Sequence, residues 1–276
     1  MSKIKCLVCP NYCYLSEGQV GICRARRNQN GQVVPINYGH ITSLALDPIE
    51  KKPLNRFYQG TKILSIGSFG CNLRCSFCQN HSISMVSKDE ALTEYKEPEH
   101  IVNLALSLKD RNNIGIAYTY NEPLIGYEYV RDCAMLAKKH GLKNVVVTNG
   151  CFEEMVLEEI IPYIDAFNID LKGFTDEFYK KLGGDLDTVK NFIKMAAKHA
   201  HVEVTTLIIP SENDSEEEMR DLSKFLADIS PEIPLHVSRF FPTYKMIDRP
   251  ATEVAKVYRL ADLARENLRY VYEGNC

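Results

Sequence analysis

Three cysteines fall within eight residues in the segment GCNLRCSFCQN, at Cys71, Cys75 and Cys78. Thiolates at this spacing can wrap one small iron–sulfur cluster, because Gly67 and Gly70 let the backbone turn tightly around it. Three ligands leave one iron without a protein ligand. A cluster that only carries electrons is normally fully ligated, whereas a metal that binds substrate keeps an open position. The spacing therefore predicts a cluster whose fourth ligand is exogenous.

Two other arrangements would use the same three cysteines. One is a zinc knuckle that takes a distant fourth ligand, and the other is a set of three cysteines buried in the core. Core burial conflicts with the polar side chains around them, because such side chains are mostly exposed. These neighbours are Asn72, Arg74, Gln79 and Asn80. We therefore favour the cluster over both alternatives.

A second group of cysteines lies near the N-terminus. Cys6, Cys9, Cys13 and Cys23 follow the pattern C-x2-C-x3-C-x9-C, a complete set of four soft ligands. Four thiolates suit a structural zinc ion or an additional iron–sulfur cluster, and the spacing does not decide between them. Without a metal, the segment has little apolar content to order it. Since ten cysteines in a reducing compartment are not expected to form a disulfide framework, we expect a metal site here.

The elements that must position these cysteines alternate between two types. From residue 61 onward, short apolar runs of β-forming residues alternate with amphipathic helical stretches, which is typical of βα units around a parallel sheet. Helices are expected over residues 187–198 and after Ser215, whose spacing from Glu218 fits a capping box. Strands are expected at residues 62–66, 114–119, 144–147, 166–169, 202–209 and 234–237.

Six βα units indicate the α/β fold class. Because six are too few to close a standard eight-stranded barrel, we expect an open, partial (β/α)6 TIM-type barrel over residues 61–276. Its site should lie at the carboxyl ends of the strands, where the three-cysteine loop follows the first strand. Residues 1–60 form a Cys-rich N-terminal extension, in which QVVPINYGHITSLAL is expected to make two strands around a turn at Gly39.

The C-x3-C-x2-C spacing, with Phe77 directly before the third cysteine, resembles the motif of the radical SAM superfamily. In that family the three thiolates hold a 4Fe-4S cluster, and the amine and carboxylate of S-adenosylmethionine (SAM) chelate the open iron. A closer resemblance is to the radical SAM enzymes of the AmmeMemoRadiSam system, which are similar to pyruvate formate-lyase activating enzyme. The segments that carry it are CLVCPNYCYLSEGQVGICRAR, LALDPIEKKPL, SIGSFGCNLRCSFCQN, HVSRFFPTYKM and YVYEGN.

The resemblance implies roles for polar residues at the ends of two strands. AYTYNEP occupies the place of the family's Gly-Gly-Glu motif, so Asn121 and Glu122 are expected to accept hydrogen bonds from the ammonium of SAM. A strand-end turn built by Asn and Pro is the alternative. Thr148 and Asn149 in VVVTNG end the next strand, where they could face the ribose or the methionyl group.

Two further pairs of residues follow from the same resemblance, with Phe77 counted among the cofactor-binding residues. Asp170 and Lys172 in NIDLKG are two residues apart on a strand, so either both line the pocket or both belong to a structural ion pair. In the activating enzymes of glycyl-radical enzymes, a proline-containing strand end and a histidine lie near the adenosine. That role falls to Pro210 and His236 here, with a structural hydrogen bond as the alternative for the histidine.

The resemblance implies a radical SAM oxidoreductase that cleaves SAM to a 5′-deoxyadenosyl radical. The radical would abstract hydrogen from a glycine of a partner protein, as glycyl-radical-enzyme activases do, or from a small molecule. A one-electron donor such as flavodoxin or ferredoxin is then required, and other proteins of the AmmeMemoRadiSam system are candidate partners. The alternative from a different class is a non-catalytic iron–sulfur electron-transfer protein, which would need no open iron.

Composition and charge argue against a nucleic-acid-binding protein and against a membrane protein. The 276 residues carry a formal net charge of −3, which gives no signature of polyanion binding. The basic run from Arg24 to Arg27 is expected to be a solvated surface rather than a nucleic-acid contact. There is neither the apolar core of a signal peptide nor a run of about 18 apolar residues that would span a membrane. We therefore expect a cytoplasmic protein that binds neither membranes nor nucleic acid.

Overall fold

An open sheet of eight strands forms the centre of the molecule in this computed structural model, which describes residues 3–276. The strand order is β14-β13-β12-β11-β10-β9-β7-β6, and every neighbouring pair is parallel except β6 with β7. The strands are β6 (Ser43–Pro48), β7 (Lys62–Gly67), β9 (Asn113–Tyr118), β10 (Lys143–Thr148), β11 (Ala166–Asp170), β12 (His201–Ile208), β13 (Leu235–Arg239) and β14 (Val271–Gly274).

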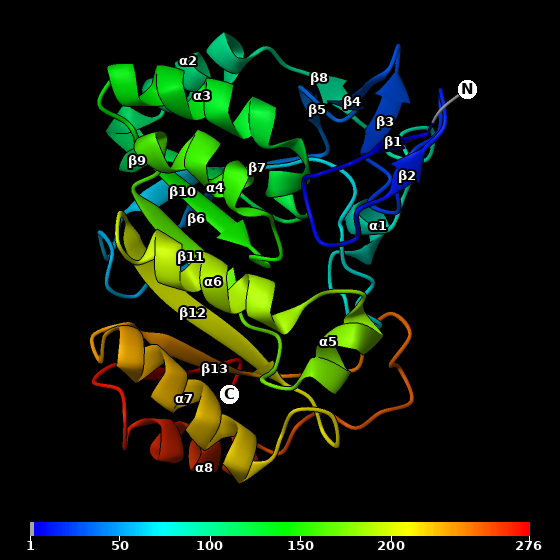
Figure 1. Ribbon diagram of the computed structural model, residues 1–276. Helices are drawn as coiled ribbons and strands as arrows, with labels where there is room; N and C mark the ends of the chain where they lie inside the picture. Colours follow the sequence, from blue (N-terminus) through cyan, green and yellow to red (C-terminus); the bar gives the residue numbers. More distant parts are fainter. Residues whose placement is uncertain (1–2) are drawn as a thin grey trace.

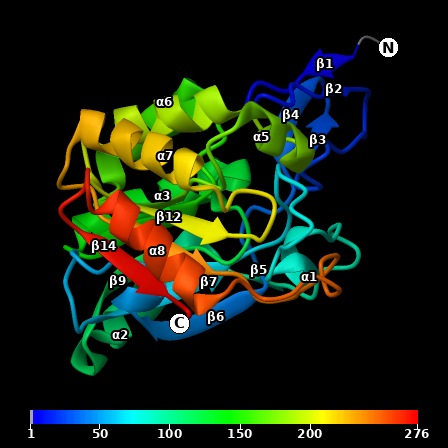
Figure 2. The same cartoon turned by 90° about the horizontal axis from the view of Figure 1, so that it is seen from below.

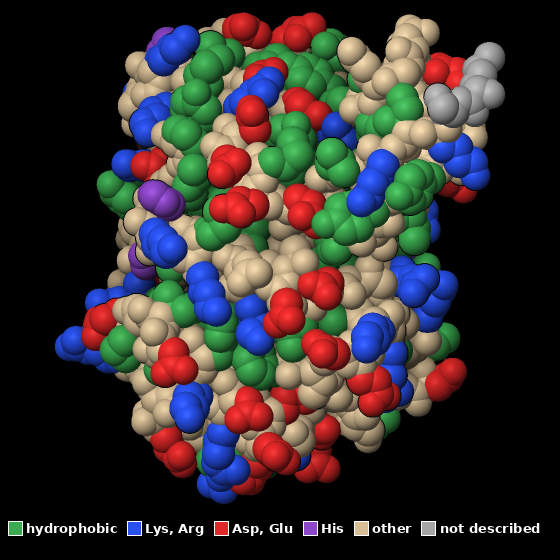
Figure 3. All heavy atoms as spheres, viewed as in Figure 1, with side chains coloured by type: hydrophobic (Ala, Val, Ile, Leu, Met, Phe, Trp, Pro, Cys, Tyr) green, Lys and Arg blue, Asp and Glu red, His purple; other side chains and the backbone are tan. Residues whose placement is uncertain are grey.

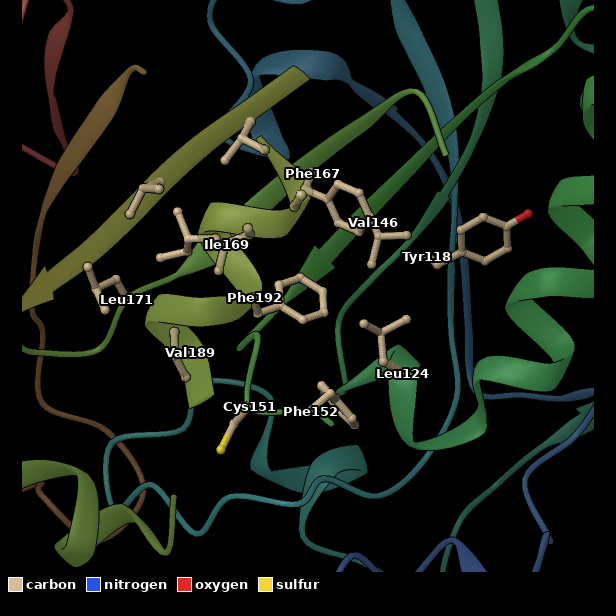
Figure 4. Packing of buried hydrophobic residues seen from close by; sticks show 14 of the residues in the cluster. Tyr118, Leu124, Val146, Cys151, Phe152, Phe167, Ile169, Leu171, Val189 and Phe192 are labelled. Carbon is tan, nitrogen blue, oxygen red and sulfur yellow. The ribbon is translucent and has the colours of Figure 1, made fainter. Parts of the chain in front are cut away.

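All six expected strands are confirmed, with ends shifted by a residue or two. Such strands are buried on both faces, so they occur as nearly continuous apolar runs. Figure 4 shows one layer of this core, where Phe167 of β11 meets Phe192 edge to face at 5.8 Å between ring centroids. Tyr118, Val146 and Ile169 extend the same layer across neighbouring strands. The expected partial barrel is thus present, and β14 adds a seventh parallel strand that the apolar pattern did not predict.

Helices cover the outer face of the sheet (Figures 1 and 2). The helix expected near residues 187–198 is α6, and the helix expected after Ser215 is α7. Only half of the capping box forms: Ser215 Oγ accepts from the amide of Glu218, whereas the Glu218 carboxylate accepts from the amide of Phe174. The helices are α1 (His81–Ser84), α2 (Pro98–Ser107), α3 (Tyr127–Lys139), α4 (Glu154–Ile160), α5 (Asp176–Leu182), α6 (Leu186–Ala196), α7 (Glu216–Ile229) and α8 (Val254–Ala264), with 3-10 turns at Ile49–Lys51, Lys109–Arg111, Pro123–Gly126 and Ile161–Tyr163.

The two strands expected around a turn at Gly39 are present, and Gly39 has a φ of 71°, but these strands do not pair with each other. β4 (Gln32–Pro35) pairs instead with β3 (Arg26–Gln29), and β5 (His40–Ile41) pairs with β8 (Glu94–Tyr95). The hairpin turn is Asn30-Gly31, with φ values of 53° and 77°. Asn-Gly is the sequence favoured where both central residues need positive φ, so this local signal marked the turn of the β3–β4 hairpin.

The first 60 residues are not separate from the barrel. β6 extends the main sheet as its antiparallel edge, while β1 (Ile4–Lys5) and β2 (Tyr14–Leu15) pair with each other. Figures 1 and 2 place this N-terminal segment, in blue, at the end of the sheet toward which the parallel strands point. Arg26 anchors it: the residue is 3% exposed, and its guanidinium binds both carboxylate oxygens of Glu128 at 2.9 and 2.6 Å. The expectation of a solvated basic run is therefore wrong for Arg26.

Charges on the face seen in Figure 3 are mixed, with Lys and Arg side chains interspersed among Asp and Glu. Within residues 3–276, every helix is too short or too polar to traverse a lipid bilayer.

Candidate functional site

The loop after β7 brings three thiols to one cavity at the carboxyl ends of the strands. Cys71, Cys75 and Cys78 all line this cavity, which has a volume of about 400 Å³. Gly70 makes the turn with a φ of +89°, a value that residues with a side chain rarely adopt. Cys75 is buried, and the other two thiols are half-buried. Three soft donors in one loop at the mouth of a partial barrel fit the open-iron cluster that the spacing predicts.

Burial shapes the chemistry of these thiols. It raises the pKa of Cys71 well above the ordinary value, and the nearby Glu122 carboxylate adds to the rise. It also raises the pKa of Cys75 to about 11, although the Lys172 ammonium opposes that shift. Soft metals bind the thiolate form, so a bound metal must displace these protons and its positive charge must offset the cost of burial. The donor set is thus suited to a highly charged metal centre rather than to free thiolates.

Glu122 is the buried acid of the cavity, with 3% of its surface exposed. Its carboxylate accepts three hydrogen bonds, from Thr148 Oγ1 at 2.8 Å, Asn149 N at 2.8 Å and Leu124 N at 3.0 Å. Burial nevertheless raises the pKa of Glu122 to about 7, because these three donors only partly offset it and the Asp170 carboxylate raises it further. A carboxylate has about four acceptor positions. One position is therefore left for a further donor.

Asn121 is placed beside Glu122 but makes different contacts. Its Oδ1 accepts from the amide of Ser68 at 2.9 Å, and its Nδ2 donates to the carbonyl of Gly70 at 3.1 Å. Both ends of the side chain amide are therefore engaged with the loop that carries the cysteines. In the structure Asn121 positions that loop, whereas the family resemblance implied that it contacts the ammonium of SAM.

Thr148 and Asn149 support Glu122 and the cysteine loop together. Besides their bonds to Glu122, Asn149 Nδ2 donates to Asn72 Oδ1 at 2.9 Å and lies 3.7 Å from Cys71 Sγ. Donors to a thiolate sulfur tune the redox potential of a cluster. Both residues line the cavity. Their partners are thus a carboxylate and a cluster ligand, and neither side chain is free to reach far into the cavity.

Asp170 and Lys172 form an ion pair at 2.7 Å and both line the cavity, so the two alternatives offered by their spacing coexist. Burial alone would lower the pKa of Lys172, but the charges of Asp170 and Cys75 outweigh it and raise that pKa. Lys172 thus supplies a stable positive charge next to the thiols. Phe77 lines the same cavity and stacks on Phe178, with ring planes 7° apart.

Pro210 and His236 are not brought to this cavity. Pro210 follows β12 at the carboxyl end of the sheet, but it is absent from the residues that line the cavity, and its carbonyl accepts from Arg249. His236 lies near the amino end of β13, where its Nε2 donates to Glu203 at 2.7 Å and its ring stacks on Tyr272. The structural alternative stated for the histidine describes its position.

A buried cluster that was not predicted from the sequence also borders this cavity. Lys52 is 3% exposed and pairs with Asp47 at 2.7 Å, and Tyr120 donates to the same carboxylate at 2.5 Å. Tyr120 adopts a φ of +72°, an uncommon value for a bulky residue. Lys52 and Tyr120 line the cavity. Asp47 and Lys52 both lie in LALDPIEKKPL, one of the segments that carry the family resemblance. They were not predicted to belong to the site, because a Lys-Lys-Pro run ordinarily indicates an exposed turn.

The N-terminal cysteines lie against the three-cysteine loop. Cys6, Cys9 and Cys23 are each 7% exposed, and Cys13 is half-buried. The carbonyl of Cys23 accepts from the amide of Cys71 at 3.2 Å. The two groups of cysteines that are far apart in the sequence are thus direct neighbours. Cys133, in contrast, is fully buried in α3, and Cys151 is fully buried after β10.

Comparison with known families and proteins bears on this arrangement. Residues 65–223, from within β7 to within α7, match the family model described as the radical SAM superfamily. The chain is 42% identical over 278 residues to the uncharacterized protein MJ0808 of Methanocaldococcus jannaschii, a match that covers 99% of this chain and 82% of that protein. It is 28% identical over 172 residues to pyruvate formate-lyase-activating enzyme of Clostridium pasteurianum, covering 58% of this chain and 67% of that enzyme.

A solved structure shares the fold. Streptococcus suis SuiB bound to S-adenosylmethionine superposes with a TM-score of 0.61 at 16% identity, over 78% of this chain. The match covers 52% of the SuiB chain, so about half of that protein has no counterpart here. At this identity the likeness concerns the architecture, an α/β partial barrel with its cavity at the carboxyl ends of the strands.

Proposed function

Because the chain belongs to the radical SAM superfamily, we propose that it cleaves SAM reductively at a 4Fe-4S cluster held by Cys71, Cys75 and Cys78. The observation that supports this most is that these three thiols share one cavity with a buried acid, Glu122, which has an acceptor position left. When bound, the cluster supplies one electron that splits SAM into methionine and a 5′-deoxyadenosyl radical, which takes hydrogen from the substrate.

The chain's own residues then have distinct tasks. Glu122 accepts the fourth hydrogen bond from the ammonium of SAM, an interaction between opposite charges in a site with little water. Thr148 and Asn149 hold that carboxylate in place through the hydrogen bonds described above. Asn121 fixes the backbone of the cysteine loop. Lys172 places a positive charge beside the thiolates, which lowers the cost of gathering negative charge there.

We propose a glycine of a partner protein as the substrate, because the chain is similar to a pyruvate formate-lyase-activating enzyme. A flavodoxin or a ferredoxin supplies the electron. A small-molecule substrate and a non-catalytic electron-transfer protein are the outcomes that a test must separate from this. The four N-terminal cysteines are proposed as a second metal centre, holding zinc or iron and sulfide.

The test is anaerobic reconstitution with iron and sulfide, followed by dithionite reduction in the presence of SAM. We expect 5′-deoxyadenosine from the wild type and none from Cys75→Ala, because that thiol is one of only three ligands. Cys276→Ala is the matched control, since Cys276 is exposed and outside both groups; it should keep full activity. A Cys75→Ala protein that still forms 5′-deoxyadenosine would contradict the assignment.

The substrate class is read from the fate of deuterium. In an extract of cells grown on deuterated glycine, transfer of deuterium into 5′-deoxyadenosine supports a protein glycine. Deuterium that arrives only from labelled metabolites overturns the glycine proposal while leaving SAM cleavage intact. Reduction of the cluster with no cleavage of SAM would instead support the electron-transfer protein.

A further inference from the structure

The four N-terminal cysteines converge from two turns. Cys6, Cys9 and Cys13 lie in the connection of the β1–β2 hairpin, where the amide of Cys6 donates to the carbonyl of Cys13 at 2.9 Å. Cys23 comes from the turn before β3. A Cβ built on Gly21 would lie 3.6 Å from Cys13 Sγ and 3.8 Å from Cys23 Sγ. Cys13 Sγ and Cys23 Sγ, which come from different turns, therefore border the same small space.

These thiols are kept together without a covalent link. All four are free cysteines. Only a few apolar side chains of the segment are buried, among them Val8 and Leu15. A short segment with so small a core is normally held by disulfides or a metal. In the absence of disulfides, the gathered thiols indicate a metal centre.

The position of the thiols favours a cluster over zinc. Within residues 3–276, no three or more His, Cys, Asp or Glu side chains are placed to hold a metal ion as they stand, and this holds equally for the loop with Cys71, Cys75 and Cys78, whose family holds a 4Fe-4S cluster there. Zinc has no redox chemistry, whereas an iron–sulfur cluster can take up and pass on an electron. The amide of Cys71 donates to the carbonyl of Cys23, so a centre at the N-terminal thiols lies directly against the loop where an electron is needed.

Two contacts join this centre to the barrel loop. The carbonyl of Cys23 accepts from the amide of Cys71, and Gly70 packs so closely that a Cβ there would be 2.5 Å from the same carbonyl oxygen. Asn11 Nδ2 lies 3.7 Å from Cys9 Sγ and donates to the carbonyl of Asn72 at 3.0 Å. One hydrogen bond therefore links a ligand residue of each set.

The outer side of the segment is apolar and basic. Leu7, Tyr14 and Ile22 are 53%, 62% and 45% exposed, and each directly follows or precedes a cysteine of the set. The only acidic residue among residues 3–27 is Glu17. Arg26 is buried against Glu128, so the basic residues of the surface are the exposed Lys3 and Lys5 and the half-buried Arg24 and Arg27. An apolar centre with a basic rim complements the surface of an acidic partner and speeds its encounter.

We propose that Cys6, Cys9, Cys13 and Cys23 hold a second 4Fe-4S cluster that receives the electron from an acidic one-electron carrier docked on Leu7, Tyr14 and Ile22. The electron then passes through the Cys23–Cys71 hydrogen bond toward the barrel site. The carrier, a reduced flavodoxin or ferredoxin, is oxidised by one electron, the second cluster is reduced and reoxidised, and no atom is transferred. The destination of the electron rests on the proposed function, whereas the presence of the second cluster does not.

The first experiment counts metal. A Cys71→Ser/Cys75→Ser/Cys78→Ser variant, reconstituted anaerobically, should keep about four irons and four sulfides per chain, against about eight of each in the wild type. It should show the electron paramagnetic resonance signal of a reduced cluster. The Cys6→Ser/Cys9→Ser variant should give the complementary count of about four, and Cys276→Ser should keep about eight. Zinc in the first variant, or eight irons in the second, would overturn the proposal.

The second experiment follows the electron. In Cys6→Ser/Cys9→Ser, dithionite should reduce the barrel cluster as fast as in the wild type, because a small reductant needs no docking surface. Reduction by flavodoxin, followed by rapid-freeze spectroscopy, should slow by at least about tenfold. Lys5→Glu should raise the flavodoxin concentration needed for half-maximal rate without changing the iron content. An unchanged flavodoxin rate in the double variant would refute the relay.

The two proposals fail in different ways. A wild type with about eight irons that reduces normally but never cleaves SAM leaves the second cluster in place and removes the proposed function. A wild type that cleaves SAM with only about four irons, all of them lost in the triple variant, removes the second cluster and leaves the proposed function in place.

Discussion

Two buried glutamates at opposite ends of the same sheet have opposite electrostatic surroundings. Glu203, in β12 near the amino ends of the strands, is fully buried, and Glu122 at the carboxyl end is 3% exposed. Burial alone would raise the pKa of Glu203, but hydrogen bonds from His201, His236 and the amides of Asn55 and Arg56 outweigh it and lower that pKa to about 2.

Glu203 and Glu122 differ in how completely the protein supplies their hydrogen-bond donors. The four donors to Glu203 all come from the protein, so the acid is satisfied in the folded chain and ties the segment at Asn55 to the barrel. Glu122 receives only three donors, each of them electrically neutral, and its pKa is raised to about 7. A buried acid that lacks a cation is costly to ionise. A buried acid whose hydrogen bonding the protein leaves incomplete, such as Glu122, is therefore the one expected to contact a ligand.

The largest effect is expected from removing Glu203, the acid whose hydrogen-bond donors all come from the protein. Glu203→Ala leaves two imidazoles and two amides without their buried acceptor, so we expect a loss of about 3–5 kcal/mol in the free energy of unfolding. Urea denaturation measures it. SAM affinity of the folded fraction should change less than about twofold, and Glu203→Gln, which keeps one acceptor oxygen, should lose less stability. A loss below about 1 kcal/mol would break the comparison.

Replacement of Glu122, at the carboxyl end of the sheet, should instead change SAM affinity far more than stability. Glu122→Gln should weaken SAM binding by about 30-fold or more, because about 2 kcal/mol or more is lost with a buried charge partner. Stability should change little. In the wild type, SAM affinity should rise as the pH increases through about 7, since Glu122 must lose its proton to pair with an ammonium. Calorimetric titration of Glu122→Gln should show no such rise from this group; a persisting rise would assign it elsewhere.

Acid should remove the contribution of Glu203 to stability. Its folded pKa, about 2, lies below the ordinary 4.5, so its contribution to stability is complete above about pH 4.5 and is lost as the pH falls toward 2. The loss should approach about 3 kcal/mol and should shrink in Glu203→Gln. The pKa of Asp47 is also lowered to about 2, because burial is outweighed by hydrogen bonds from Lys52 and Tyr120, so acid should titrate this group as well. The difference between the wild type and Glu203→Gln isolates the contribution of Glu203. Glu122 acts oppositely: with its folded pKa raised above 4.5, it favours folding less as the pH rises from about 4.5 to 7. Denaturant unfolding over this pH range separates the two.

The smallest effect is expected from removing one of the three hydrogen-bond donors to Glu122. Thr148→Val removes the hydroxyl that donates to Glu122, which should raise the pKa of that acid further and weaken SAM binding about fivefold at neutral pH, equivalent to about 1 kcal/mol. Thr188→Val, on the exposed start of α6, is the control and should not change affinity. An unchanged affinity in Thr148→Val would mean that the three donors are redundant.

Local patterns in the sequence predicted the strands and the cysteine loop, because buried parallel strands and ligand spacing are both written in neighbouring residues. The partnership of Glu203 with His236 was not predictable in this way. It depends on the parallel register of β12 and β13, in which Thr205 lies opposite His236, and on the arrival of Asn55 from another segment. The turn at Gly39 was predicted, but the partners of the strands on either side of it were not, because a single Gly does not specify a hairpin, whereas Asn30-Gly31 does.

The candidate site shows the same limit. Asn121 and Glu122 are adjacent, so one role was expected for both, yet their side chains bind different partners. Lys52 and Asp47 were missed because a buried ion pair between residues of an edge strand and the following turn leaves no periodic pattern.

The contact between Gly70 and Cys23 has a consequence for the order of folding. No side chain fits at position 70, so the two segments meet backbone to backbone. The N-terminal segment also depends on residues far along the chain, because the carbonyl of Val8 accepts from the amide of Glu153 and Arg26 pairs with Glu128. The turns that carry the N-terminal cysteines therefore reach their final arrangement only after the barrel has folded at least as far as the loop that follows β10.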